Sequence, residues 1–169
     1  TSYAITLKKN IITGNSKKID GIRADSGKLI LSSNTISSCS RAIILSSKVK
    51  GTVYPNTFKK NTYNNVKVNS SYVNTLTVKS LSGKSKSAKT ATLNWKKLSS
   101  ASGYVVYRSA SKNGSYTKIS TIKKNKTITY KDSKLKRKST YYYKIVPYTT
   151  IGKTTVYGLD SKIVSIKIK

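Results

Sequence analysis

An Asn-x-apolar triplet recurs at nearly constant spacing in the first part of this 169-residue chain. Its three copies are Asn10-Ile11-Ile12, Asn34-Thr35-Ile36 and Asn56-Thr57-Phe58. The copies start 24 and then 22 residues apart. A period in the twenties is typical of solenoids, in which each repeat buries its apolar face only against its neighbours. The N-terminal part is therefore expected to be a stack of short coils.

A second phase follows each triplet, with a small or turn residue before a β-branched one, as in Gly21-Ile22 and Ala42-Ile43. A small polar residue also recurs three positions past each triplet, as Asn15, Cys39 and Asn61. Leucine-rich repeats have a similar period but need several Leu in each repeat. Because β-branched residues dominate here, short strands fit better. The side chains expected to point inward are Ile5, Ile12, Ile22, Ile30, Ile36, Ile44, Val53, Phe58, Val66 and Val68.

Together, the triplets, the Gly-Ile or Ala-Ile step and the coil length resemble the right-handed parallel β-helix repeats of pectate lyase-like and carbohydrate-binding proteins. The resemblance covers residues 1–68, and it implies that Ile12, Ile36 and Phe58 lie on top of one another. Three coils bury few side chains, at roughly 1.5–3 kcal/mol each, and an open first coil is a template for aggregation. Further coils of the same parent protein, or a stacked neighbour, are therefore expected as partners.

The second part of the chain alternates apolar and polar residues in short runs. Strands are predicted at 91–95, 104–108, 116–119 and 127–130, with a hairpin turn at Asn113-Gly114. The segment from Leu135 to Tyr148 carries the strongest signal, and it places Tyr141 and Tyr143 on one face of a strand. No window has the periodicity of a long amphipathic helix, so the whole chain is predicted to be all-β.

In that segment Leu135, a short turn and Thr140-Tyr141 resemble the E–F corner of fibronectin type III domains. The hydroxyl of the corner tyrosine of that family forms a hydrogen bond back to the backbone. Trp95 at the end of a predicted strand fits the same immunoglobulin-like pattern. The predicted organisation is therefore parallel β-helix coils over 1–70 and a fibronectin type III-like β-sandwich over 71–169.

Charge limits the choice of partner, since 34 Lys and Arg against four Asp and no Glu give a net charge of +30. So much positive charge opposes compactness and indicates a polyanion nearby. Thirty of the 34 basic residues are Lys, a hydrated point charge suited to diffuse attraction more than to bidentate recognition. The fold resemblance implies a secreted or cell-surface protein of a bacterium. Anionic polysaccharide or cell-wall polymer is therefore preferred over nucleic acid.

The sequence contains few residues that could serve in catalysis. The four carboxylates, Asp20, Asp25, Asp132 and Asp160, are best explained as turn residues. Two aspartates in adjacent coils make a poor calcium site, since calcium takes six to eight oxygens. No His is present, and Cys39, alone in the chain, is expected to be a small buried residue. No catalytic residue, metal site, cofactor or membrane span is predicted.

Two lysine clusters in predicted loops are the candidate binding residues, together with two tyrosines expected on the outer face of their strand. They are Lys123, Lys124, Lys126, Lys134, Lys136, Arg137, Lys138, Tyr142 and Tyr148. The leading hypothesis is a non-catalytic extracellular binding and spacer module. Two alternatives remain open: the C-terminal part of a β-helix polysaccharide lyase or glycoside hydrolase whose catalytic coils lie upstream, and a structural subunit of a surface filament or layer.

Overall fold

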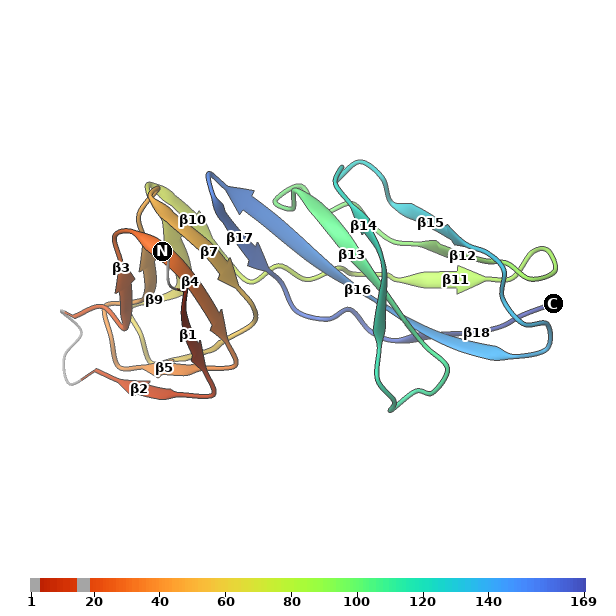
Figure 1. Cartoon of the computed structure of the whole chain (residues 1–169), viewed down its shortest axis with the longest axis horizontal. Helices are drawn as coiled ribbons and strands as arrows, with labels where there is room; N and C mark the ends of the chain where they lie inside the picture. The colour runs from red at the N-terminus through yellow and green to blue at the C-terminus, as the bar shows by residue number, and fades with distance from the viewer. Residues whose placement is uncertain (1–3, 15–18) are drawn as a thin grey trace. The chain divides into compact units, whose positions relative to one another are not determined.

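The computed structural model describes residues 4–14 and 19–169, and every regular element within them is a β-strand (Figure 1). The all-β prediction is confirmed for these residues. Contacts divide the chain into two compact units. The N-terminal unit comprises 1–75 and 149–158, and the sandwich unit comprises 76–148 and 159–169. The units therefore do not follow a single cut in the sequence after residue 70.

Three sheets of parallel strands form the N-terminal unit, and the chain visits each sheet in turn on every passage. The first sheet runs β1 (Ala4–Lys8), β4 (Gly27–Ser32), β7 (Val49–Val53) and β17 (Thr154–Tyr157). The second runs β2 (Ile11–Thr13), β5 (Thr35–Ser37) and β8 (Thr57–Lys59). The third runs β3 (Ile22–Ala24), β6 (Arg41–Leu45) and β9 (Tyr63–Val68), with β10 (Ser71–Val73) antiparallel to β9.

Equivalent side chains of successive passages lie opposite one another in these sheets. The structure pairs Ile12 with Ile36 and Ile36 with Phe58. Ile36 in the middle is fully buried, whereas Ile12 and Phe58 are half-buried. Because each strand is short, the contact between neighbouring passages supplies most of the burial.

In two strands the side chains predicted to face the core, Ile30 and Ile44, are not the buried ones. Leu29 and Leu31 are buried in β4, while Ile30 between them is only partly covered. In β6 the buried residues are Ala42, Ile43 and Leu45, and Ile44 is only partly covered. Since side chains alternate between faces, an error of one position moves the whole apolar set to the other side. Ile5 is 62% exposed although it pairs with the buried Leu29, because β1 is the edge strand.

A ladder of asparagines connects the first sheet to the second. The backbone N–H and the Nδ2 of Asn34 both donate to Oδ1 of Asn56, at 2.9 Å each. Asn10 makes the same pair of bonds to Oδ1 of Asn34, at 2.9 and 3.0 Å. At the next turn the backbone N–H of Cys39 donates to Oδ1 of Asn61 at 2.9 Å. Asn15, expected at the same ladder position, lies outside the described residues.

One strand of the N-terminal unit comes from far along the chain. β17 pairs in parallel with β7, with Val156 opposite Val53. The buried Thr154 hydroxyl donates to the carbonyl oxygen of Val49 at 3.0 Å. A Cβ on Gly51 would lie 2.9 Å from the Thr154 side chain, so glycine is what lets the two strands approach. β17 thereby completes the backbone pairing of β7 on its open side.

Two antiparallel sheets form the sandwich unit, of three and four strands. The smaller runs β11 (Ser82–Lys84), β12 (Ala91–Asn94) and β15 (Thr129–Asp132). The larger runs β18 (Val164–Lys167), β16 (Thr140–Ile151), β13 (Gly103–Ser109) and β14 (Thr117–Ile122). Trp95 packs edge-on against Tyr104, with ring centroids 5.4 Å apart, inside a core that includes Leu93, Tyr143 and Ile145. The hydroxyl of Tyr141 accepts the backbone N–H of Lys136 at 3.3 Å.

Candidate functional site: the cationic end of the sandwich

The predicted binding lysines lie at two different ends of the sandwich unit. Lys123, Lys124 and Lys126 precede β15, and the cluster at 134–138 follows it. Because β15 separates the two loops, the structure does not bring the clusters together. All seven of these basic side chains are exposed.

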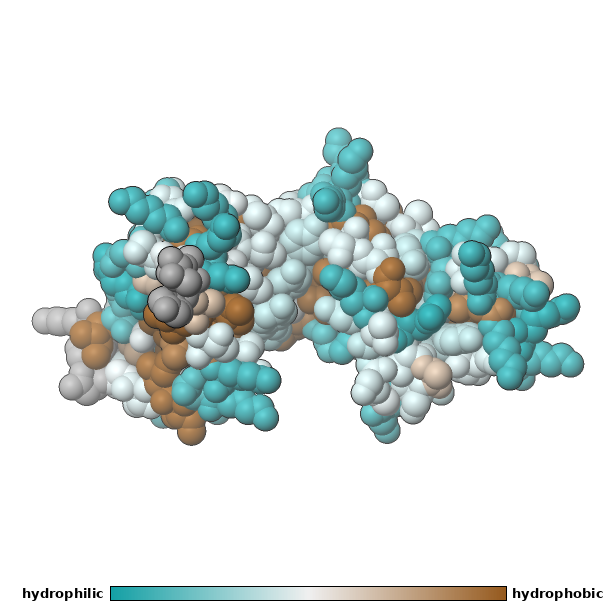
Figure 2. Space-filling model, in the orientation of Figure 1, coloured by the Kyte–Doolittle hydropathy of each residue, from teal (hydrophilic) through white to brown (hydrophobic). Residues whose placement is uncertain are grey.

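The second cluster has neighbours that the sequence pattern did not reveal. The loop between β11 and β12 and the last residues of the chain reach the same end, so that residues 84–90, 133–139 and 167–169 gather there. We call these three segments the cationic end. They hold three, four and two basic residues, all exposed, and no Asp or Glu. Figure 2 shows hydrophilic surface over this end of the sandwich.

Backbone hydrogen bonds hold the three segments of the cationic end together. The N–H of Leu135 donates to the carbonyl oxygen of Lys89 at 3.0 Å, and the N–H of Lys138 donates to that of Ile168 at 2.9 Å. The N–H of Lys169 donates to Oγ of Ser85 at 3.1 Å. The lysine backbones are therefore fixed, and only the flexible side chains remain to adapt to a ligand.

Three lysines of the cationic end have left-handed backbone angles. The φ values of Lys89, Lys134 and Lys138 are 60°, 60° and 59°. Glycine reaches this region without steric cost, whereas another residue costs about 1–2 kcal/mol there. The chain therefore carries positive charge at three turns where glycine would suit the backbone better.

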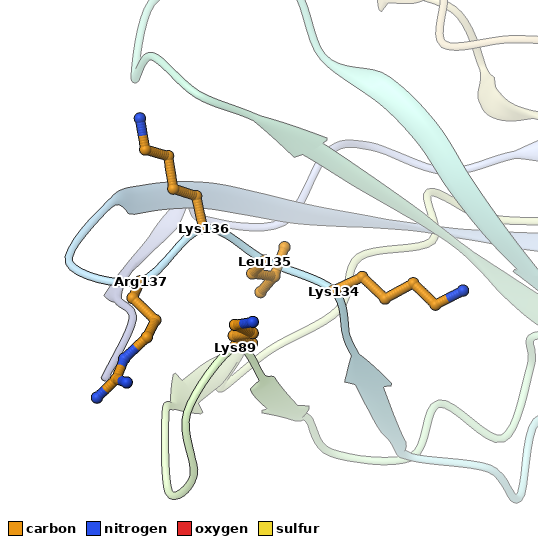
Figure 3. A pocket seen from close by; sticks show the side chains of 5 residues that line it. All are labelled: Lys89, Lys134, Leu135, Lys136 and Arg137. Atoms are coloured by element: carbon orange, nitrogen blue, oxygen red, sulfur yellow. The ribbon is translucent and has the colours of Figure 1, made fainter.

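A shallow hollow of about 630 Å³ lies at the centre of this end (Figure 3). It is lined by Lys89, Lys134, Leu135, Lys136 and Arg137. In Figure 3 the charged ends of Lys134, Lys136 and Arg137 point in different directions, away from one another. Side chains that diverge in this way do not enclose one small anion. It suits several anionic groups spaced along a polymer.

The carboxylates of the chain are all engaged by cations elsewhere. Asp132, which is buried, accepts hydrogen bonds from Arg108 at 3.0 Å and from the Tyr143 hydroxyl at 2.9 Å. Burial raises the pKa of Tyr143 above its usual value of 10, and the hydrogen bond to Asp132 raises it further. Asp160 pairs with Lys144 at 2.7 Å.

At the other end of the chain, Asp20 and Asp25 both pair with Arg23, at 3.5 and 3.7 Å. All four aspartates thus form ion pairs, and Asp132 lies in β15, not in the turn expected for it. No Asp or Glu side chain is left to neutralise the cationic end.

The two candidate tyrosines lie on the other side of β16 from the core residues Tyr143 and Ile145, and both are half-buried. Tyr148 donates to the carbonyl oxygen of Ile122 at 3.4 Å and lies against Gly103. Burial raises its pKa. Tyr142 lies opposite Ser109 on β13 and Ser165 on β18. Neither tyrosine belongs to the cationic end.

Within residues 4–14 and 19–169, no three His, Cys, Asp or Glu side chains gather as metal ligands would. Among the same residues, no helix has the length and apolar character needed to cross a membrane.

The chain matches no known family model, and no curated protein matches it. Among solved structures it is similar to a Fn3-like protein from Clostridium thermocellum, with 30% identity over 54% of this chain and 88% of that one (TM-score 0.45). The FN1–FN3 domains of chicken CNTN1 match at 17% identity over 63% and 35% (TM-score 0.49). The sixth fibronectin type III domain of human fibronectin type III domain containing protein 3 matches at 19% over 57% and 87% (TM-score 0.46). These structural neighbours are fibronectin type III domains.

Proposed function

We propose that this chain is a non-catalytic binding and spacer module of a secreted or cell-surface protein. In this proposal the sandwich unit is a fibronectin type III-like domain and the N-terminal unit is a short run of parallel β-helix coils. The ligand is an anionic polysaccharide or cell-wall polymer. The observation that carries the proposal is the convergence of nine exposed basic residues, without a carboxylate side chain, from three segments of the sandwich.

A polymer fits this surface better than a small anion does. The side chains around the hollow point away from one another, so one phosphate or carboxylate would contact few of them (Figure 3). Lysine also attracts anions without fixing their geometry. Successive charged groups of a flexible chain can instead each meet one cation. This mode of binding depends on salt, because exposed charges are screened.

The test compares two variants that each remove three positive charges. One is Lys134→Gln/Lys136→Gln/Arg137→Gln at the cationic end, and the control is Lys123→Gln/Lys124→Gln/Lys126→Gln at the opposite end of β15. Binding to polygalacturonate and to a teichoic acid is measured by calorimetry from low to high salt. At about 0.5 kcal/mol for each exposed ion pair, the first variant should bind roughly tenfold more weakly than the unmodified protein.

The control variant should lose less than about threefold in affinity, through net charge alone. Equal losses in the two variants would contradict a site at the cationic end. Binding that does not weaken with salt would contradict the electrostatic mechanism altogether.

A further inference from the structure

Two tyrosines of the N-terminal unit each lie beside a cation along strand β9. The guanidinium of Arg41 lies 5.1 Å from the ring centroid of Tyr63, and Nζ of Lys67 lies 5.5 Å from that of Tyr72. We call these four residues the β9 strip. Both rings are about half exposed, at 47% for Tyr63 and 51% for Tyr72. We propose that the β9 strip is a second binding surface, specific for acidic sugars of a polysaccharide.

The chemistry of each pair suits a sugar that carries a carboxylate. A half-exposed tyrosine ring offers an apolar surface to the C–H groups of a sugar, and its hydroxyl can exchange hydrogen bonds with sugar hydroxyls. The cation beside each ring can bind the carboxylate of the same sugar. Ring and cation also attract each other, so the pair is held ready before a ligand arrives.

Charge around the β9 strip favours an anion. Strands β6, β9 and β10 contain no Asp or Glu. The nearest acids along the chain, Asp20 and Asp25, are both paired with Arg23. The cations of the strip therefore have no carboxylate partner among the residues of these strands.

The spacing of the pairs indicates a ligand with several sugar units. Tyr72 lies opposite Lys67, which follows Tyr63 by four positions. Four residues of extended strand span about 13 Å. One sugar ring cannot cover both tyrosines. An oligosaccharide lying along β9 can reach the two pairs in turn.

A backbone irregularity sets the position of the first pair. Between β6 and β9 the register shifts, so that three steps along β9 from Tyr63 to Val66 match two steps along β6 from Arg41 to Ile43. Such a bulge re-aims the side chains beside it and is frequent next to binding sites. Here the irregular stretch begins at the pair formed by Arg41 and Tyr63.

Single-stranded nucleic acid is the competing ligand, since bases also stack on aromatic rings beside cations. In the β9 strip each half-exposed ring has its cation within 5.1 or 5.5 Å, so a ligand meets the ring and the cation together. An acidic sugar carries its carboxylate on the same ring that contacts the tyrosine, whereas the phosphates of a nucleic acid lie on its backbone, away from the faces of the bases. We therefore favour the acidic polysaccharide.

The experiment uses the whole chain and measures affinity at one intermediate salt concentration for every protein, because high salt would screen the cations of the β9 strip as well as those of the cationic end. The probes are polygalacturonate fragments, their methyl-esterified neutral form and poly(dT). The variant is Tyr63→Ala/Tyr72→Ala, and the control is Tyr116→Ala, another tyrosine with a lysine over its ring, 4.8 Å from Lys144. The double variant should bind polygalacturonate about tenfold more weakly than the unmodified protein, and the control should change less than about twofold. Methyl esterification should weaken binding to the unmodified protein.

A second readout does not depend on removing the rings. Tyr63→Trp and Tyr72→Trp keep an aromatic platform and add fluorescence, while Trp95, the natural tryptophan, is buried. Polygalacturonate should change the emission of both variants but not that of the unmodified protein. Equal affinities of the double variant and the control, or an emission that does not respond, would overturn the proposal. Tighter binding of poly(dT) than of polygalacturonate, lost in the double variant, would overturn it in favour of nucleic acid. The variants at the cationic end are not involved, so failure here leaves the proposed function intact.

Discussion

In the N-terminal unit buried side chains such as Leu31, Ile36 and Leu45 lie opposite their counterparts on the next passage of the chain, whereas in the sandwich the buried side chains meet across two facing sheets. Ile36 is paired on both sides, with Ile12 and with Phe58. Among the described strands, Ile12 is paired on one side only, with Ile36 of β5. In the sandwich, Trp95, Tyr104 and Tyr143 belong to one shared core. Burial in the N-terminal unit therefore depends on position in the stack, and burial in the sandwich does not.

The largest effect that tests this contrast is expected from shortening one isoleucine of the stack. Ile36→Ala removes a fully buried side chain and should lower the free energy of unfolding of the N-terminal unit by about 2–5 kcal/mol. The same change at half-buried Ile12 should cost less than half as much, because fewer contacts are lost. Hydrogen exchange of peptides from 4–14 and 19–75 measures both. Equal losses of stability in the Ile36→Ala and Ile12→Ala variants would mean that burial does not depend on position in the stack.

A smaller effect is expected from breaking the asparagine ladder. Asn34 is fully buried, and its amide bonds to Asn56 and to the carbonyl oxygen of Leu7, at 2.9 and 3.0 Å. Asn34→Ala should cost about 1–3 kcal/mol, because buried polar groups lose their partners. Asn125→Ala is the matched change in the sandwich, where the amide makes one exposed bond of 3.4 Å to Ser99. It should cost no more than about 0.5 kcal/mol, and a similar loss at both positions would contradict the role of the ladder.

The smallest expected effect is a loss of stability at high pH that is confined to the sandwich unit. The pKa of Tyr143 is raised in the folded sandwich, so the folded state keeps a proton that the unfolded chain releases near pH 10. This contribution to stability is complete below pH 10 and is lost as the pH rises through the folded pKa, by at most about 1.4 kcal/mol per pH unit. Urea unfolding monitored by Trp95 fluorescence at pH 9, 10 and 11 measures this loss of stability.

The control for the pH effect is Tyr143→Phe, which has no hydroxyl to ionise. Its stability should fall less between pH 9 and 11 than that of the unmodified protein. Lysine deprotonation acts in both proteins and cancels in the comparison. Identical pH dependence in the two would show that Tyr143 does not cause the loss.

Repeats and alternation predicted much of this fold because they reflect local geometry. The Asn-x-apolar spacing led to the register in which Ile12, Ile36 and Phe58 meet. The inward phase of 28–31 and 41–45 was not predictable in the same way. Both runs contain adjacent apolar residues, such as Ile43 and Ile44, and the sequence alone does not say which of two neighbours faces the core.

The candidate site was predicted only in part. The run from Lys134 to Lys138 was visible because its charges are adjacent in the sequence. Lys89 and Lys169 were not, because they reach the same place through strand pairing between distant segments. The β9 strip was missed for the same reason, since Arg41 and Tyr63 are brought together only by the pairing of β6 with β9.

Strand β17 has a consequence for how the protein is made. Thr154 bonds to Val49 across 105 residues of sequence, so the ribosome completes the first three passages long before their last partner strand exists. Closing so long a loop is entropically costly and slow compared with local pairing. The nascent N-terminal unit must therefore wait, with the edge of β7 uncovered, until the 105 residues from Val49 to Thr154 have been synthesised.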